Sequence, residues 1–154
     1  MMNTILIEKE KRCLSVFDAE GQRLLHCPVA LGKTPVGHKM CEGDGKTPEG
    51  AYFVCLKREK GKYGFSLGLS YPSLSDANLA VSEGRMDASL LHLFEEAERE
   101  TKRPPWGTSL GGEIYIHGGG IDHDWTAGCI ALRDSDMEKV FALMEHGGRV
   151  TITR

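Results

Sequence analysis

The sequence predicts a mainly β protein of the α+β class, with two or three helices flanking the strands. Glycine accounts for 19 of the 154 residues, and glycine at this level favours turn-rich β structure over a helical bundle. Apolar and polar residues alternate over several short stretches, as they do in half-buried strands. Helical spacing of apolar residues is confined to three stretches. The length fits one domain with a single core, residues 1–154.

Strand-like alternation dominates the first part of the chain. It predicts strands at residues 3–7, 13–18, 23–31, 51–58 and 63–72. Pro28 interrupts the third of these, which indicates an edge strand or a bulge because proline cannot donate to a sheet ladder. Residues 32–50 form a long loop rich in glycine and proline. A loop of this length inside a compact domain is usually functional or mobile.

Helical patterns are found only after residue 72. They predict helices at residues 75–81, 87–101 and 137–146. The first begins with Ser73 or Ser75 as its N-cap. The second has apolar side chains at i, i+3, i+4 and i+7, so it buries one stripe and exposes an acidic face. The third follows an acidic cap at residues 134–136, and Gly147 ends it in a left-handed conformation. Further strands are predicted at residues 114–116, 130–132 and 149–154.

Composition and charge exclude several classes of function. The formal net charge is −3, so no basic footprint indicates nucleic-acid binding. A run of about 18 apolar residues is absent from the sequence, so no membrane span is expected. The first residues lack the apolar segment of a secretory signal. This is consistent with a cytoplasmic protein, or with one whose leader has been removed.

The chain contains five cysteines, an odd number that leaves at least one of them unpaired. Four are interpreted as buried structural thiols, since free cysteine behaves as a small hydrophobic residue: Cys13, Cys27, Cys41 and Cys55. The sequence contains no Cys-x-x-Cys pair, which argues against a structural zinc. The unpaired thiol with a chemical role is assigned to Cys129.

Residues 113–133 contain the clearest pattern of reactive side chains. An alternating apolar stretch delivers His117 at its end, three glycines follow, and Cys129 opens a second apolar stretch. Two strand ends joined by a glycine-rich loop can bring these side chains into contact. A free thiol is only slightly ionised at neutral pH, so a nucleophilic cysteine needs a neighbouring base. The pattern predicts Cys129 as nucleophile and His117 as base, with a buried structural thiol as the alternative.

Gly128 supports the prediction that Cys129 is a nucleophile. A metal site is the alternative interpretation of the same stretch. A glycine directly before the nucleophile permits a backbone approach in which its own N–H and the next one point toward an oxyanion. Mixed nitrogen, oxygen and sulfur ligands could instead hold zinc. Such ligands would come from His117, Asp122, His123, Asp124 and Cys129. Of the two, the nucleophile is preferred, and the predicted site contains no metal and no cofactor.

Two short motifs occur in order along the chain. Lys-Thr-Pro-x-Gly lies at residues 46–50, and Ile-His-Gly at residues 116–118 precedes Thr-x-Gly-Cys-Ile-x-Leu at residues 126–132. Together they resemble the catalytic core of the L,D-transpeptidase (YkuD-like) family of peptidoglycan enzymes. The resemblance implies a β-sandwich or mixed sheet. It also implies cysteine-dependent acyl transfer on peptidoglycan stem peptides at an extracytoplasmic location, which conflicts with the missing signal segment.

The resemblance implies a role for each residue of the motifs. Cys129 is the nucleophile, His117 is the base, and the backbone carbonyl of Gly118 orients the imidazole. Thr126 and Gly128 belong to the segment that binds the oxyanion and the substrate. The resemblance further implies that carbapenems acylate the cysteine.

The chain departs from the family pattern close to the cysteine. Ala127 stands where many members have a second histidine; His123 could substitute for it, or it could be an exposed loop residue. The arginine that often follows the cysteine is displaced to Arg133, where it could bind a substrate carboxylate. Trp125 and Tyr71 are expected to line the cleft, or alternatively to be packed aromatic residues.

These departures leave the type of reaction open. The leading interpretation is a transpeptidase, in which an amine resolves the thioester. A carboxypeptidase or amidase of the same fold, in which water does so, is the first alternative. The second is a catalytically silent module that binds cell-wall peptide.

Overall fold

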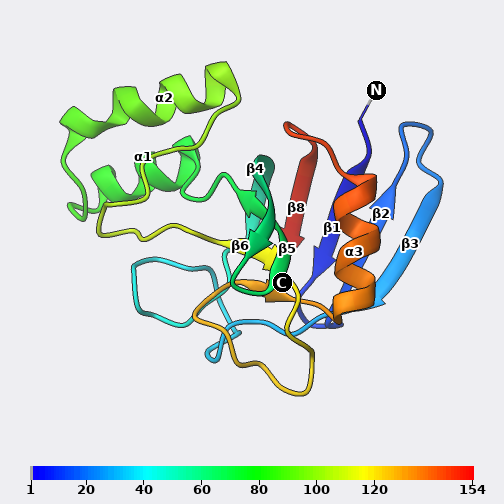
Figure 1. Ribbon diagram of the computed structural model, residues 1–154. Helices are drawn as coiled ribbons and strands as arrows, with labels where there is room; N and C mark the ends of the chain where they lie inside the picture. Colours follow the sequence, from blue (N-terminus) through cyan, green and yellow to red (C-terminus); the bar gives the residue numbers. More distant parts are fainter. Residues whose placement is uncertain (1) are drawn as a thin grey trace.

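The structure is a computed structural model that describes residues 2–154. It confirms the predicted fold class, because these residues form an eight-stranded curled mixed sheet with three α-helices (Figure 1). The strands are β1 (Thr4–Glu8), β2 (Cys13–Phe17), β3 (Arg23–Pro28), β4 (Gly50–Gly61), β5 (Gly64–Leu69), β6 (Tyr115–His117), β7 (Ile130–Ala131) and β8 (Arg149–Thr153). The helices are α1 (Leu74–Ser82), α2 (Leu91–Glu100) and α3 (Asp134–Leu143), with a 3-10 turn, η1 (Ala88–Leu90), before α2.

The strands follow one another in the order β3-β2-β1-β8-β4-β5-β6-β7. The pairs β1–β8 and β6–β7 are parallel, and the other neighbours are antiparallel. Pro28 ends β3, the first strand in this order, so the predicted edge position is confirmed. β3 is shorter than predicted, since the chain leaves the ladder at this proline.

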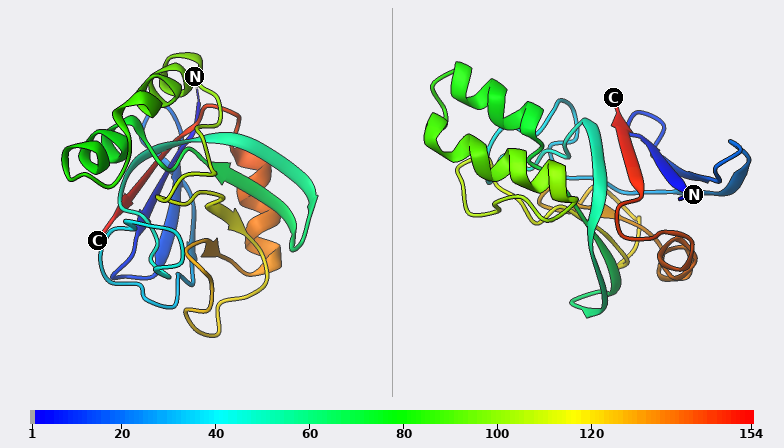
Figure 2. Two further views of the ribbon diagram at one scale, coloured as in Figure 1. Left: turned by 90° about the vertical axis from the view of Figure 1, so that its left-hand side faces the viewer. Right: turned by 90° about the horizontal axis from the view of Figure 1, so that it is seen from above.

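The chain beyond β3 returns to the opposite end of the sheet. Ala30 and Ala131 exchange two backbone hydrogen bonds of 2.9 Å, and a parallel bridge joins Gly32 to Thr126. The sheet therefore curls until the extension of β3 pairs with β7, as the two views in Figure 2 allow the reader to follow. This closure holds the segment around Cys129 between β6 on one side and residues 30–32 on the other.

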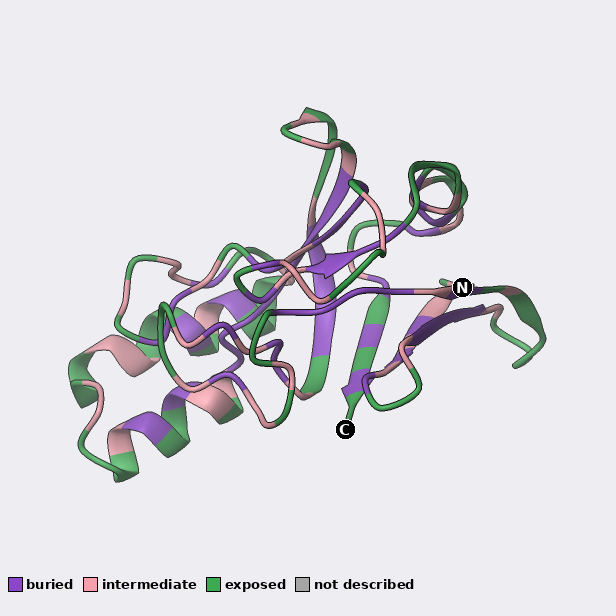
Figure 3. Ribbon diagram, turned by 90° about the horizontal axis from the view of Figure 1, so that it is seen from below, coloured by how far each residue is buried: buried purple, intermediate pink, exposed green. Residues whose placement is uncertain are grey.

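The helices cover the sheet unevenly. α1 and α2 form a pair on one side of β4, and α3 lies on the other side (Figure 1, Figure 2), where it contacts β5 and β6. Phe94 and Ala97 are the buried residues of α2, while its acidic face is largely exposed, as predicted (Figure 3). α3 buries Met137 and Val140 against the main core. In the described residues, no helix is long and apolar enough to cross a membrane.

Three helix boundaries differ from the prediction. The single helix predicted at residues 87–101 is split, because the Asp87 carboxylate accepts the N–H of Ser89 and caps a 3-10 turn instead of an α-helix. The third helix begins at Asp134 and ends at Leu143, three residues early at both ends. Its acidic residues form the first turn, where the helix dipole favours them. Met144 then adopts an extended conformation, so Gly147 does not cap this helix.

The start of α1 settles a choice that the sequence left open. Ser73 is the N-cap, and its side chain accepts a hydrogen bond from the N–H of Asp76 at 3.0 Å. The Asp76 carboxylate accepts the N–H of Ser73 at 2.9 Å in return. The two bonds form a capping box, which satisfies two backbone donors at the helix terminus.

Candidate active site

β6 and β7 bring His117 and Cys129 to the same edge of the sheet. The strands are parallel, with His117 opposite Ala131. Two residues earlier on each strand, Cys129 therefore falls beside Tyr115. Residues two apart on a strand project to the same face, so this register directs Cys129 and His117 to one face as diagonal neighbours. The loop that joins the strands, residues 118–129, is hereafter the β6–β7 loop.

The thiol of Cys129 is held by the backbone of the segment that leads into β6. The sulfur accepts a hydrogen bond from the N–H of Tyr115 at 3.3 Å and donates one to the carbonyl of Glu113 at 3.5 Å. Burial raises the pKa of the thiol; the Tyr115 N–H and the charge of Lys39 oppose this effect only in part, and Glu113 reinforces it. The resting side chain is therefore a neutral thiol, which needs a base before it can attack.

The imidazole of His117 is buried, and the next residue orients it. Nδ1 lies 2.5 Å from the carbonyl oxygen of Gly118. Because a carbonyl can only accept, Nδ1 carries the ring proton and Nε2 carries the lone pair. Burial lowers the pKa of His117, and the bond to Gly118 offsets this only in part. The neutral ring thus has the protonation state and the tautomer that a general base requires.

Two aromatic side chains fix the plane of this imidazole. Tyr63 stacks on it with ring centroids 4.5 Å apart and an interplanar angle of 15°. Trp125 meets its edge at 5.7 Å and 66°, and the indole Nε1 donates to the carbonyl of Gly120 at 3.0 Å. Sequence analysis singled out Trp125 but not Tyr63, whose position in the turn between β4 and β5 gives no sequence signal.

An open hollow of about 260 Å³ adjoins the aromatic group. It is lined by Tyr63, Gly119, Gly120, Asp122, His123 and Trp125. Trp125 therefore both packs on His117 and borders open space. His123 is exposed at this hollow, on the same loop as Trp125. The hollow offers room for a ligand beside Tyr63 and Trp125, the two rings that pack on His117.

Within the described residues, no hydrogen bond joins the thiol of Cys129 to the imidazole of His117. The thiol donates to Glu113 and Nδ1 of the imidazole faces Gly118. Catalytic hydrogen bonds are often long or misaligned in structures without substrate and form in the complex. The two groups therefore share a sheet face without being engaged with each other.

Thr126 builds the turn that precedes the cysteine. Its hydroxyl donates to the carbonyl of Cys129 at 2.7 Å and accepts the N–H of Gly128 at 3.1 Å. Gly128 has φ +140°, and a Cβ there would lie 2.8 Å from the carbonyl oxygen of Lys46. Only glycine fits this position. Its N–H is, however, bonded to Thr126, and this bond competes with the predicted oxyanion role.

Asp124 anchors the β6–β7 loop to the turn between β1 and β2. Its carboxylate accepts from Nη2 of Arg12 at 2.8 Å, from Nε at 3.2 Å, and from the N–H of Leu31 at 2.9 Å. Burial alone would raise the pKa of Asp124, but these bonds outweigh it and hold the pKa below its ordinary value. Asp124 therefore takes part in an ion pair rather than in the alternative zinc site. Within residues 2–154, no three His, Cys, Asp or Glu side chains are grouped so that they could hold a metal.

Among the described residues, two other predicted site residues make no hydrogen bond to the thiol of Cys129. Tyr71 is 1% exposed, and its hydroxyl donates to the carbonyl of Leu110 at 2.7 Å. The expectation that it lines a cleft is wrong, because the hydroxyl is satisfied inside the core and the ring is covered. Arg133 is exposed at the N-cap of α3, where its side chain makes no capping hydrogen bond.

The structure adds a buried ion pair that sequence analysis missed. Nζ of Lys39 lies 3.0 Å from Oδ1 of Asp44, and the side chains are 3% and 13% exposed. Asp44 belongs to the Gly-Asp-Gly turn before the Lys-Thr-Pro-x-Gly motif, which is a signal of a constrained position. Lys39 gives no such signal, because a lysine in a polar loop is normally solvated.

Comparison with known proteins identifies the family and the fold. The family model of the YkuD L,D-transpeptidase catalytic domain matches residues 2–152. The helical cell shape determining protein Pgp2 from Campylobacter jejuni has a similar structure, with 25% identity and a TM-score of 0.70, over 99% of this chain and 48% of that one. Bd1075 from Bdellovibrio bacteriovorus gives 24% identity and a TM-score of 0.61, over 98% and 47%.

A third structure shares the fold at lower identity. The L,D-transpeptidase from Stackebrandtia nassauensis gives 15% identity and a TM-score of 0.58, over 100% of this chain and 56% of that one. The chain thus spans about half the length of these solved relatives. A comparison with curated proteins gives no match. Because the family model covers nearly every residue, the chain belongs to the YkuD family, the L,D-transpeptidase catalytic domain.

Proposed function

We propose that this chain is a cysteine-dependent acyltransferase of the L,D-transpeptidase type that acts on peptidoglycan stem peptides. One observation carries the proposal: Nδ1 of His117 is bonded to Gly118, which leaves Nε2 as a base on the sheet face that also bears Cys129. Membership of the YkuD family supports the class of substrate. An extracytoplasmic location follows from that substrate.

The reaction begins with proton transfer from the Cys129 thiol to Nε2 of His117. The sulfur then attacks the carbonyl carbon of a stem-peptide bond, and a tetrahedral intermediate forms. When that intermediate collapses, the C–N bond breaks, the leaving amine takes the proton back from the imidazolium, and a thioester remains. An acceptor amine attacks the thioester in transfer, and water does so in hydrolysis; in both cases the thiol is regenerated.

The backbone before the nucleophile supplies the donors for the intermediate. The N–H of Cys129 and that of Gly128 are the two groups in this position. The Gly128 N–H is bonded to Thr126 in the resting structure, so it becomes available only when this turn adjusts to the substrate. An oxyanion donor contributes about 10²–10³ in rate.

The open hollow beside Trp125 is our candidate for the place where the substrate lies. It is bordered by Tyr63 and Trp125, and both rings pack on the imidazole that must protonate the leaving amine. Arg133 is exposed at the start of α3, where it is free to meet a substrate carboxylate. The stem peptide is the only partner that the proposal requires.

A specific observation favours a second candidate, a catalytically silent module that binds cell-wall peptide. The thiol proton is directed to the carbonyl of Glu113, and burial raises the pKa of Cys129. A thiol that stays in this bond would not react. Because the same contacts also fit a resting enzyme, a direct test of covalent chemistry separates the two.

The test is the intact mass of the protein after incubation with a carbapenem and, separately, with a tetrapeptide stem. We expect a single adduct with the carbapenem, and loss of the terminal D-residue from the tetrapeptide. The Cys129→Ala variant should give neither. The His117→Gln variant should retain the fold and acylate about 10²–10⁴-fold more slowly, as expected for loss of a general base.

The products then decide between the related activities. Joining of the tetrapeptide to an added amine indicates transfer, and a free tripeptide acid indicates hydrolysis. A folded protein that binds the tetrapeptide but gives no adduct and no product would contradict the proposal and establish the silent module.

A further inference from the structure

The buried pair formed by Lys39 and Asp44 places the lysine ammonium beside Gly128, the residue before the nucleophile. Asp44 is fixed in place by three backbone donors, the N–H groups of Met40 at 2.8 Å, Cys41 at 3.2 Å and Lys46 at 3.1 Å. It holds Nζ of Lys39 at 3.0 Å. The position of the ammonium is therefore determined by the loop and not by solvent.

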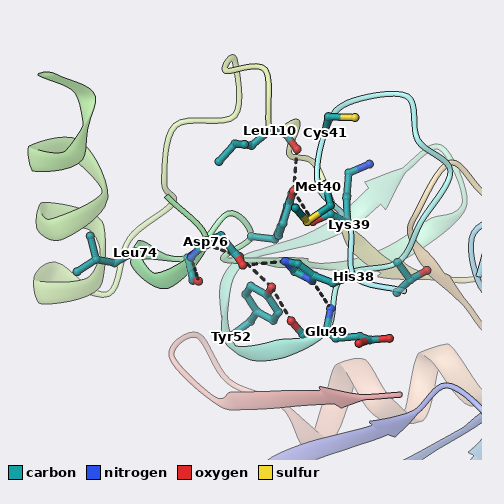
Figure 4. A network of polar contacts seen from close by, with 12 residues as sticks. His38, Lys39, Met40, Cys41, Glu49, Tyr52, Leu74, Asp76 and Leu110 are labelled. Atoms are coloured by element: carbon teal, nitrogen blue, oxygen red, sulfur yellow. Dashed lines mark hydrogen bonds and ion pairs between the residues drawn. The ribbon is translucent and has the colours of Figure 1, made fainter. Parts of the chain in front are cut away.

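Gly128 provides the contact between this pair and the site. A Cβ placed on Gly128 would lie 3.7 Å from Nζ of Lys39, so the ammonium packs against the residue that precedes Cys129. The backbone of Lys39 lies against Tyr71 on the other side, with its carbonyl oxygen 3.3 Å from the tyrosine hydroxyl. Figure 4 shows the Lys39 side chain directed away from Asp76 and the network around it.

The ammonium has hydrogen-bonding capacity to spare. A lysine has three N–H donors, and among the described residues Asp44 is the one acceptor recorded for Lys39. The side chain is only 3% exposed, so water does not readily take the other two. Burying a lysine in this way is costly, which calls for a compensating interaction on the side that faces Gly128.

At rest, His117 does not supply a positive charge to the thiol. Burial favours the neutral form of both Cys129 and His117, so negative charge on sulfur is not balanced by an imidazolium until the proton has moved. Two charged side chains act on the thiol, and they have opposite effects: Lys39 favours the thiolate and Glu113 disfavours it.

We propose that Lys39, held by Asp44, is an electrostatic positioning residue whose positive charge stabilises the thiolate of Cys129. The inference deepens the proposed function, since it requires Cys129 to be the nucleophile. One contact links the two regions of the chain that contain the motifs. The Gly-Asp-Gly turn before the Lys-Thr-Pro-x-Gly motif holds the lysine, and Gly128 of the second motif lets the lysine approach the cysteine.

Lys9 is a matched control for this role. It is equally buried, and its ammonium is paired with Glu49 at 3.1 Å. It also donates to the carbonyls of Gly37 at 2.8 Å and Thr47 at 2.7 Å, so its charge is paired and two of its donors are taken by the β3–β4 loop, residues 29–49. Loss of Lys9 should therefore destabilise the same loop without changing the charge beside the thiol.

The experiment measures the rate at which iodoacetamide alkylates Cys129 as a function of pH, with the modified peptide followed by mass spectrometry. The interpretation of Cys41 as a buried thiol is wrong, because it lies exposed in the β3–β4 loop. A Cys41→Ser background therefore removes a competing thiol. In the Lys39→Met variant we expect alkylation near neutral pH to be about ten-fold slower, and the profile to move up by about one pH unit. Lys39→Arg should restore most of the rate, and Lys9→Met should leave the profile unchanged.

A second variant gives a shift of opposite sign. Asp44→Asn removes the negative charge that partly neutralises Lys39, so its profile should move to lower pH. A profile of folded Lys39→Met that superimposes on that of the parent would overturn the proposal, as would an upward shift in Asp44→Asn. If Lys39→Met does not fold, Asp44→Asn decides alone.

Alkylation separates this inference from the proposed function. Iodoacetamide reports on the thiolate and needs neither stem peptide nor turnover. A shifted profile in a protein that no carbapenem acylates would support the role of Lys39 and contradict acyl transfer. Rapid carbapenem acylation, with no effect of Lys39→Met on acylation or on alkylation, would support acyl transfer and contradict the role of Lys39.

Discussion

The two loops that meet at Gly128, the residue before Cys129, are held in different ways. The β3–β4 loop, residues 29–49, is fixed along its length by side chains. His38 donates from Nε2 to Asp76 at 2.9 Å and accepts the N–H of Glu49 at 2.8 Å through Nδ1 (Figure 4). Tyr52 donates to the same carboxylate at 2.9 Å. The β3–β4 loop is therefore held in place by hydrogen bonds to residues of the core and of α1.

The β6–β7 loop is anchored at both ends and exposed between them. Asp124 binds Arg12, and Thr126 closes the turn to Cys129. At the other end, the N–H groups of Gly119 and Gly120 donate to Asp134 and to the carbonyl of Leu132, each at 3.0 Å, whereas Asp122 and His123 are exposed. The β3–β4 loop therefore has fixed side chains beside Gly128, whereas the middle of the β6–β7 loop is open to solvent and to a ligand.

Among the substitutions considered, Asp76→Ala should reduce the free energy of unfolding most. Asp76→Ala removes the acceptor shared by His38, Tyr52 and the N–H of Ser73, so three donors lose their partner in a buried region. We expect the free energy of unfolding to fall by about 3 kcal/mol, measured by urea denaturation. Asp76→Asn keeps an acceptor and should lose roughly half as much; an equal loss in both variants would mean that charge, not acceptor number, is decisive.

Two glycines of the β6–β7 loop, Gly128 and Gly120, should differ in the free energy lost on substitution by alanine. Gly128→Ala places a Cβ 2.8 Å from the carbonyl oxygen of Lys46 at φ +140°, so it should cost about 2 kcal/mol and strongly reduce acylation. Gly120→Ala has a positive φ but no atom within 4 Å of the new Cβ. It should cost about 1 kcal/mol, from backbone strain alone. Thermal unfolding and carbapenem acylation measure both, and equal losses would contradict the difference in close contacts.

The ion pair that anchors the loop should have a smaller effect on stability than on activity. Both partners are partly exposed, so Arg12→Met should lower the free energy of unfolding by about 1 kcal/mol. Acylation should slow about ten-fold, because small displacements of reacting groups are expensive. Arg12→Lys, which cannot reproduce the two-nitrogen contact, should be intermediate. An acylation rate equal to that of the parent would show that the anchor does not position Cys129.

The same pair predicts a pH dependence. The pKa of Asp124 is lowered in the folded state, so the unfolded chain binds more protons in the window below its ordinary value of about 3.9. The contribution to stability is complete above that value and is lost as the pH falls through the lowered pKa. Acid unfolding of Arg12→Met should therefore differ least from that of the parent at the lowest pH; a constant difference throughout would contradict this assignment.

His123 should have the smallest effect. It is exposed in the middle of the β6–β7 loop, so His123→Ala should change the free energy of unfolding by less than about 0.5 kcal/mol. We expect carbapenem acylation to be unchanged. A large loss of acylation would instead mean that His123 substitutes for the histidine that Ala127 replaces.

The fold was predictable from sequence to a large extent, because each strand carries its own alternation. The predicted helix boundaries were wrong where a side chain competes with the backbone for hydrogen bonds. Asp87 turns the start of the second helix into a 3-10 turn, and Asp134 enters its helix instead of capping it. Propensity alone cannot decide between these outcomes, since they differ by single hydrogen bonds.

The site was predictable where a motif marked it and not where it depends on contact between distant segments. His117 and Cys129 end one strand and open the next, so local sequence identifies them as candidates. Tyr71 and Lys39 could not be placed, because their burial depends on the carbonyl of Leu110 and on Asp44. A lysine loses its solvent only when the rest of the chain encloses it.

The pairing of Ala30 with Ala131 also has a consequence for the order of folding. These residues are far apart in the sequence, so their contact raises the contact order and is formed only after a large loop has closed. β8, which joins β1 to β4, follows Cys129 in the sequence, so the two parts of the sheet are connected only when β8 has paired with both. The position of Cys129 between β6 and residues 30–32 is therefore completed by the closure of the sheet, although each of these partners precedes it in the chain.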